Sequence, residues 1–278
     1  MPDFIFGTVG APISTPKKPG GSIGAIQTLS TLGLFAIELG WVQSVRVSVE
    51  TCTLIKQESR TKGVSLSVHA PYFINLNGSD EEWPKSRQRL MDAANYGHLA
   101  GATDIIFHPG SYFEAKPEEV LKVAIPRLSA CIDELRSKSN PVILRPETMG
   151  KSALLGSFED TLEMSKSIPG VLPCLDFAHL HARPGDGTIN STREWSEYLE
   201  RYETILGNGS LHALHIHLSG IAYSTKGEKN HLPLRESDLH LLDLFRVLKS
   251  ASCSGRILCE SPIMEEDAVY MMELWESL

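Results

Sequence analysis

Short apolar runs alternate along the chain with longer segments in which apolar residues recur at helical spacing. The short runs predict eight strands, at 4–7, 35–39, 64–69, 104–108, 142–147, 171–176, 213–217 and 257–260. Helices are predicted near 22–32, 45–61, 86–100, 118–138, 157–167, 191–206, 237–250 and 265–277. Eight strand–helix units with a mean length of about 35 residues predict an α/β protein, a single (β/α)8 TIM barrel over residues 1–278.

Local signals support these helices and the barrel. The segments 157–160 and 191–194 resemble capping boxes, in which a serine covers free N–H groups, and Pro117 suits the first turn of its helix. The alternative is a doubly wound open sheet, which usually has a glycine-rich phosphate-binding turn after its first strand. Residues 7–14 lack the GxGxxG pattern of that turn, so the barrel is favoured.

Composition narrows the class of protein further. Apolar residues make up 42% of the chain and charged residues 22%, which excludes a collagen-like or disordered chain. The five cysteines form no CxxC pair and are odd in number, so we expect reduced thiols in a cytoplasmic protein. We find no secretory signal and no apolar stretch long enough to span a bilayer, and expect no membrane association. The net charge of −8 argues against non-specific coating of a polyanion.

Candidate chemistry lies at the carboxyl ends of the predicted strands, where TIM barrels carry their active sites. Seven of the eight ends are His, Asp or Glu: Glu38, His69, His108, Glu147, Asp176, His217 and Glu260. Each alone is more often a structural polar residue, but together they would be costly to bury without a cation. Mixed nitrogen and oxygen ligands indicate Zn²⁺ first, with Mn²⁺ also suitable. His215 lies on the same strand face as His217 and is its alternative as a ligand. Glu38 has no partner that the sequence identifies, so we interpret it as structural.

Six stretches carry a resemblance that covers nearly the whole barrel. They are HAPYFINL at 69–76, HPGS at 108–111, ETMG at 147–150, CLDFAH at 174–179, HLSG at 217–220 and the glutamate at 260. In this order they resemble the endonuclease IV family (AP endonuclease family 2) of the xylose isomerase-like barrels. That resemblance implies a TIM barrel with a trinuclear zinc cluster. It also implies a DNA-repair hydrolase that uses a metal-bound hydroxide to cleave the phosphodiester 5′ to abasic sites.

The resemblance also implies a role for each matching residue. His69 and His108 would bind the first metal ion, and Glu147 would bridge it to the second. The second ion would be completed by Asp176, His217 and Glu260, and the third would be bound by His179 and His231. Glu147 and Glu260 would be the catalytic residues, with Glu260 orienting the attacking hydroxide. The residues expected to contact DNA are Tyr72, Asn75 and Ser111. Two or three zinc ions and DNA containing abasic sites are therefore the expected cofactor and partner, and no protein partner is predicted.

The chain departs from the family pattern at the third metal ion. The family motif there is Asp-x-His, but Lys229 stands where the aspartate belongs, two residues before His231. A charged lysine has no lone pair to donate to a metal. We therefore expect Glu228, one position earlier and one methylene longer, to supply the carboxylate while Lys229 turns outward. The alternative is that the third metal site is weak or empty. The loop at 7–14 and the pair Ser219-Gly220 also differ from the family pattern.

Two other functions compete with the nuclease. Sugar isomerases and epimerases of the same superfamily hold one metal ion at the ends of strands five to eight. The residues Glu147, Asp176, His217 and Glu260 satisfy that pattern equally well, with two glutamates as acid and base. The second alternative is a metal-bound barrel that binds without catalysis. The additional histidines at 69, 108, 179 and 231 favour the nuclease, because a one-metal enzyme does not need them.

Overall fold

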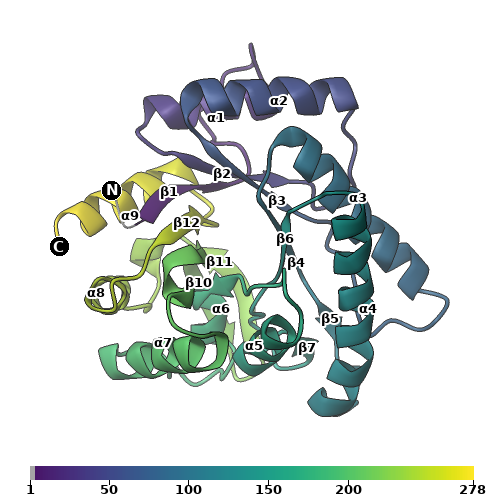
Figure 1. The fold of residues 1–278 in the computed structure, drawn as a ribbon. Helices are drawn as coiled ribbons and strands as arrows, with labels where there is room; N and C mark the ends of the chain where they lie inside the picture. Colours follow the sequence, from purple (N-terminus) through teal and green to yellow (C-terminus); the bar gives the residue numbers. More distant parts are fainter. Residues whose placement is uncertain (1–3) are drawn as a thin grey trace.

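Eight parallel strands form a barrel in the computed structural model, which describes residues 4–278 (Figure 1). The barrel strands are β1 (Phe4–Val9), β2 (Ala36–Gly40), β3 (Ser65–His69), β4 (Asp104–Phe107), β6 (Ile143–Pro146), β8 (Leu175–Asp176), β9 (Leu214–Leu218) and β12 (Gly255–Cys259). Their order in the sheet is β6-β4-β3-β2-β1-β12-β9-β8. Parallel bridges from Leu144 to Val171 and from Glu147 to Cys174 join the two ends of this order, which confirms the predicted barrel.

Helices cover the outside of the barrel. They are α1 (Gly21–Thr31), α2 (Val49–Lys62), α3 (Trp83–Ala100), α4 (Pro117–Ser137), α5 (Phe158–Ser167), α6 (Phe177–Ala182), α7 (Thr192–Leu206), α8 (Leu241–Ser250) and α9 (Glu265–Glu276). The core lies between strands and helices. Trp275 of α9, for example, packs edge-on against Phe4 of β1 and Phe245 of α8. Such apolar contacts between each strand and its covering helices are the main force that closes the barrel.

Capping chemistry sets several helix boundaries. The Ser157–Asp160 capping box is present, and Pro117 occupies the first turn of α4, as predicted. At α7 the Ser191 side chain accepts from the Glu194 N–H, whereas the Glu194 carboxylate accepts from the two residues before the cap. Helix α2 begins at Val49 and not near 45, because Ser48 caps it by accepting from the Thr51 N–H.

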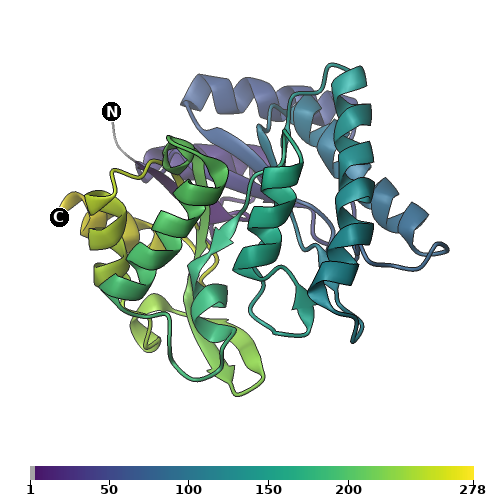
Figure 2. The same ribbon diagram turned by 60° about the horizontal axis from the view of Figure 1, so that its bottom comes forward.

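Short elements at the carboxyl ends of the strands were not predicted. Two of them form a hairpin, β10 (Gly220–Ser224) and β11 (Gly227–Leu232), which extends beyond the barrel strands (Figure 2). A smaller pair, β5 (Gly110–Ser111) and β7 (Leu154–Leu155), joins the loops after β4 and β6. The predicted strand at 171–176 shrinks to β8, because Pro173 lacks the N–H that a regular ladder needs. These additions build the rim around the site.

Buried charges tie the opposite, amino-terminal end of the barrel together. Asp104 at the start of β4 pairs with Arg145 of β6 and with Arg256 of β12, at 2.5 Å and 2.9 Å. Arg145 also donates to the carbonyls of Pro173 and Ala213, at 2.8 Å and 3.0 Å. Since these partners come from five segments around the barrel, the cluster fixes its amino end without using any residue of the predicted site.

Candidate metal centre

The first group of donor atoms consists of His69, His108 and Glu147. His69 ends β3, while His108 and Glu147 directly follow β4 and β6. The Nε2 atoms of the two histidines lie 3.3 Å and 3.2 Å from Oε2 of Glu147. The Nδ1 atom of His69 lies 2.9 Å from the carbonyl of Ala70, which fits a proton on Nδ1 and a lone pair on Nε2. Both Nε2 atoms thus converge on one carboxylate oxygen.

The second group shares Glu147 and adds Asp176, His217 and Glu260. One donor atom of each of the four side chains lies within 4.8 Å of the others. The Nδ1 atom of His217 is 3.6 Å from Oε1 of Glu147 and 3.4 Å from Oε1 of Glu260. Glu147 therefore faces the first group with one oxygen and the second group with the other, which is the geometry of a bridging carboxylate.

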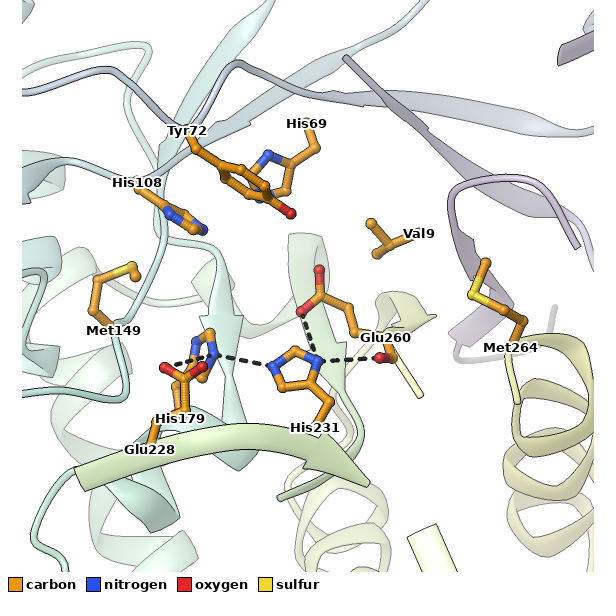
Figure 3. A pocket seen from close by; sticks show the side chains of 10 residues that line it. All are labelled: Val9, His69, Tyr72, His108, Met149, His179, Glu228, His231, Glu260 and Met264. Atoms are coloured by element: carbon orange, nitrogen blue, oxygen red, sulfur yellow. Dashed lines mark hydrogen bonds and ion pairs between the residues drawn. The ribbon is translucent and has the colours of Figure 1, made fainter. Parts of the chain in front are cut away.

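The third group contains His179, His231 and Glu228. His179 lies in the first turn of α6, where Oδ1 of Asp176 caps the helix by accepting from the His179 N–H at 2.7 Å. The Nε2 atom of His179 lies 3.3 Å from Nε2 of His231 and 3.6 Å from Oε2 of Glu228 (Figure 3). Short helix α6 thus positions two groups at once, since Asp176 also belongs to the second.

A β-bulge explains how Glu228 comes to face His231. Residues three positions apart in a regular strand point to opposite sides of the sheet. In β11, however, Asn230 pairs with Ala222 and Glu228 with Tyr223, so Lys229 is an extra residue without a partner. The bulge restores the alternation, which places Glu228 on the same side as His231 and leaves Lys229 exposed. The geometry is compatible with Glu228 as a ligand of a third metal ion, and that role stays a prediction.

Gly150 allows the hairpin to approach this closely. A Cβ atom at Gly150 would lie 2.7 Å from Cβ of Glu228 and 3.0 Å from Cδ2 of His179. The backbone N–H of Glu228 also donates to the Gly150 carbonyl at 2.9 Å. Only glycine fits here, so the ETMG stretch contributes a site residue through Glu147 and a close contact through Gly150.

Burial and charge in these groups fit a set of cations. Oε1 of Glu147, Oδ2 of Asp176 and Nδ1 of His217 are buried without a hydrogen-bond partner, although such atoms normally have one. Burial raises the pKa of the Asp176 carboxyl to about 6. Although burial opposes it, the nearby Asp176 and Glu147 raise the pKa of the His179 imidazole to about 10. The protein groups alone therefore retain protons that a bound cation would displace.

His215 and Glu38 lie one layer deeper than the three groups. His217, and not its alternative His215, faces Glu147 and Glu260. Nε2 of His215 instead donates to Oε2 of Glu38 at 2.9 Å, and Oε1 of Glu38 lies 3.1 Å from Nε2 of His217. Burial opposes ionisation of Glu38, but the adjacent His217 and His215 hold its pKa well below the usual range. The sequence indicated neither contact, since Glu38 is 177 residues from His215.

An open pocket of about 390 Å³ gives access to the donor groups (Figure 3). Tyr72 stands at its edge with 46% of its surface exposed, and its ring stacks on His108 at 5.0 Å between centroids. A second pocket shares Tyr72 and His108 and is also lined by Asn75 and Ser111. Oδ1 of Asn75 accepts from the Asn77 N–H at 2.9 Å, so part of this side chain holds its own loop.

The sequence of this chain matches a known family along most of its length. Residues 26–278 match the family model described as xylose isomerase-like TIM barrel. The chain belongs to the xylose isomerase-like TIM barrel family. It is 36% identical over 276 residues to an uncharacterized protein of Methanocaldococcus jannaschii, covering 99% of this chain and 98% of that protein.

Relatives named as endonuclease 4 confirm the resemblance to that family. A probable endonuclease 4 of Mycoplasma pneumoniae is 30% identical over 237 residues, covering 80% of this chain and 77% of the relative. Endonuclease 4 of Thermus thermophilus is 28% identical over 169 residues, and the match covers 58% of this chain and 60% of that enzyme's length.

Solved structures show the same fold in proteins with different activities. Endonuclease IV from Thermus thermophilus superposes with a TM-score of 0.70 and 21% identity, over 97% of this chain and 98% of the other. A D-tagatose 3-epimerase-like protein superposes with a TM-score of 0.71 and 18% identity, over 97% and 96%. Among residues 4–278, no helix has both the length and the apolar composition needed to cross a membrane.

Proposed function

We propose that this protein is a zinc-dependent endonuclease of base excision repair, which hydrolyses the phosphodiester 5′ to an abasic site in DNA. The observation that supports it best is that three groups of donor atoms each contribute residues to the lining of one open pocket, and that two of the groups share the buried Glu147. Each group combines imidazole nitrogen with carboxylate oxygen, a ligand set that suits Zn²⁺ and leaves Mn²⁺ as the second choice. All five cysteines are free thiols, which supports a cytoplasmic location.

Closely spaced divalent ions activate a water as nucleophile and neutralise charge on the attacked phosphate and on the leaving oxygen. Glu147 would hold two ions, because its two oxygens face different donor groups. Glu260 lines the pocket with 13% of its side chain exposed, and its carboxylate would accept a hydrogen bond from the attacking water and orient it. The exposed ring of Tyr72 occupies the edge at which the sugar without a base would lie.

An acidic chain can bind DNA here because the charge at the site is reversed by its cations. The carboxylates of Glu147, Asp176, Glu228 and Glu260 carry four negative charges. The ionised Glu38 beneath them adds a fifth negative charge. Three divalent ions would carry six positive charges, so a site loaded with three ions would be net positive and would attract a phosphate. Lys85 and Arg89 line the second pocket beside the exposed ring of Phe73, which provides a basic and aromatic path for the adjacent strand.

The second candidate is a one-metal sugar epimerase. The observation that favours it is the group of Glu147, Asp176, His217 and Glu260, whose donor atoms form a complete set for one ion. A one-metal enzyme does not need the first and third groups as ligands. We therefore prefer the nuclease, in which every group would bind a metal ion.

The decisive experiment uses a duplex oligonucleotide with one tetrahydrofuran abasic analogue, labelled at the 5′ end. The zinc-loaded protein should cut 5′ to the analogue and leave a 3′-hydroxyl that a DNA polymerase extends. An undamaged duplex of the same sequence should stay intact, and a chelator should stop cleavage. Metal analysis should give two to three zinc equivalents.

One equivalent of metal, together with epimerisation of a ketose and no cleavage, would establish the sugar enzyme instead. Bound metal without either reaction would leave a binding protein.

A further inference from the structure

Glu38 has no role among the three donor groups, yet it contacts one of their members. Its carboxylate is fully buried beneath the pocket. Oε2 accepts hydrogen bonds from Oγ of Ser67 at 2.8 Å and from Nε2 of His215 at 2.9 Å. Oε1 accepts neither of these bonds and lies 3.1 Å from Nε2 of His217. A buried carboxylate is therefore held by two neighbours on one oxygen and presents the other to a candidate metal ligand.

The two nitrogens of His217 face opposite surroundings. Nε2 faces Glu38, whereas Nδ1 faces Glu260 and Glu147 at 3.4 Å and 3.6 Å. A neutral imidazole carries its proton on only one nitrogen, and a nitrogen that carries a proton cannot bind a metal. A proton on Nδ1 would block the second group, while a proton on Nε2 would be donated to Glu38 after a small rotation of the ring.

We propose that Glu38 is a positioning residue that keeps the proton of His217 on Nε2 and so directs the Nδ1 lone pair to the second metal ion. This inference rests on the proposed metal-dependent function. Ser67 and His215 act in turn on Glu38, because their hydrogen bonds to Oε2 fix the plane of the carboxylate. Carboxylates that orient metal-binding histidines in this way typically strengthen metal binding by about 10- to 100-fold.

The test measures zinc binding and not cleavage, so that it stands apart from the nuclease activity. Glu38→Gln keeps the shape of the side chain but replaces one acceptor oxygen by a donor. In competition with a chromophoric chelator, one zinc equivalent should bind about 10- to 100-fold more weakly than in the wild type. In the background of His217→Gln, Glu38→Gln should have little further effect, because Glu38 acts through His217.

Asp104→Asn is the matched control. Asp104 is also a buried carboxylate bonded to side chains of other strands, but it lies at the opposite end of the barrel. Its loss should destabilise the fold and leave every zinc affinity unchanged.

A second measurement needs no variant at Glu38. In ¹⁵N-histidine NMR spectra of zinc-loaded wild-type protein, Nε2 of His217 should carry the proton and Nδ1 should have the shift of a zinc-bound nitrogen, assigned by the absence of these signals in His217→Gln.

Three results would overturn the proposal. The first is a zinc affinity of Glu38→Gln equal to that of the wild type at every equivalent. The second is His217 of the zinc-loaded protein with its proton on Nδ1 and zinc on Nε2. The third is a fourth zinc equivalent that disappears in Cys174→Ser, because Cys174, His215 and His217 also lie within 4.8 Å of one another and would then hold an ion of their own. Protein that binds zinc as proposed but leaves abasic DNA intact would refute the nuclease and not the role of Glu38.

Discussion

At the scale of single residues, Glu147 is the side chain that the first and second donor groups share. Its two oxygens lie within 3.6 Å of nitrogens of His69, His108, His179 and His217. We predict that Glu147→Gln folds normally, loses most of the zinc of two groups and cleaves abasic duplex at least about 100-fold more slowly. Zinc content, circular dichroism and cleavage rate measure the three effects. Full zinc content with near-normal cleavage would refute the bridging role.

Tyr72 provides a second residue-level prediction, which separates binding of the abasic site from hydrolysis of the phosphodiester. An exposed ring at the pocket edge can stack on a base or fill the space of a missing one, a contact worth about 1–3 kcal/mol. Tyr72→Ala should therefore weaken binding of abasic duplex about tenfold or more. Hydrolysis of bis(p-nitrophenyl) phosphate, which is too small to use this contact, should change little. Equal losses on both substrates would mean that Tyr72 only packs against His108.

Positions at strand ends could be predicted from the sequence, whereas side-chain contacts inside the closed barrel could not. His69, His108 and Glu147 could be found because each marks the end of an apolar run and because parallel strands end at one rim. The contact of Glu38 with His215 could not, since it depends on how side chains from opposite parts of the chain meet inside the closed barrel. The sequence indicates a structural role for Glu38, whereas the structure places its Oε1 atom 3.1 Å from Nε2 of His217.

At the scale of elements, the side to which Glu228 points in the hairpin of β10 and β11 depends on one bulged residue. Because Lys229 is the extra residue, Glu228 faces the pocket and Lys229 faces solvent. Glu228→Ala should lower the zinc content by about one equivalent and slow cleavage strongly, as loss of a ligand does. Lys229→Ala, on the adjacent residue, should change neither. If Glu228→Ala keeps the zinc content and the cleavage rate of the wild type, Glu228 does not bind zinc.

The register of the hairpin gives a further prediction at this scale. Deleting Lys229 removes the bulge but leaves Glu228 two residues before His231, and residues so spaced share a strand face. The deletion variant should therefore keep its third zinc equivalent. Deleting Asn230 together with Lys229 leaves the two residues adjacent and on opposite faces, so this variant should lose that equivalent. Zinc analysis of both purified proteins tests the prediction, and zinc loss in both would show that the bulge itself is required.

Periodicity predicted the long elements and missed the short ones. Each barrel helix has a signal over several turns, so only the starts of α2, α3 and α8 differ from the prediction by three residues or more. Helix α6 has six residues, and β5 and β7 have two each, which is too short for any pattern to repeat. Their conformation follows from tertiary contacts, such as the cap that Asp176 places on α6. Helix α6 nevertheless positions His179 of the third donor group.

At the scale of the whole molecule, the two ends of the barrel have different tasks. The carboxyl ends carry histidines and carboxylates with unpartnered buried atoms, an arrangement that is unfavourable for a protein without a ligand. The amino ends carry the cluster of Asp104, Arg145 and Arg256, in which opposite charges compensate one another. Stability and metal binding should therefore respond to separate sets of substitutions.

Asp104 gives the sharpest test of this separation. Burial opposes ionisation of Asp104, but Arg145 and Arg256 lower the pKa of its carboxyl below the usual 3.8. A carboxyl whose pKa is lower in the folded than in the unfolded state adds stability above pH 4 and loses it as the pH falls toward the folded value. Asp104→Asn removes the charge that compensates the buried Arg145 and the half-buried Arg256, and should lower the free energy of unfolding at pH 7 by about 3–5 kcal/mol.

The difference between wild type and Asp104→Asn should shrink as the pH falls from 4 toward 2. Urea unfolding at a series of pH values, with a chelator present throughout, measures it without a contribution from bound zinc. The control is Glu159→Gln, which removes the exposed ion pair with Arg201 and should cost less than about 0.5 kcal/mol. A difference for Asp104→Asn that stays constant between pH 7 and pH 2 would mean that the asparagine disturbs packing and that the charge of Asp104 does not stabilise the barrel.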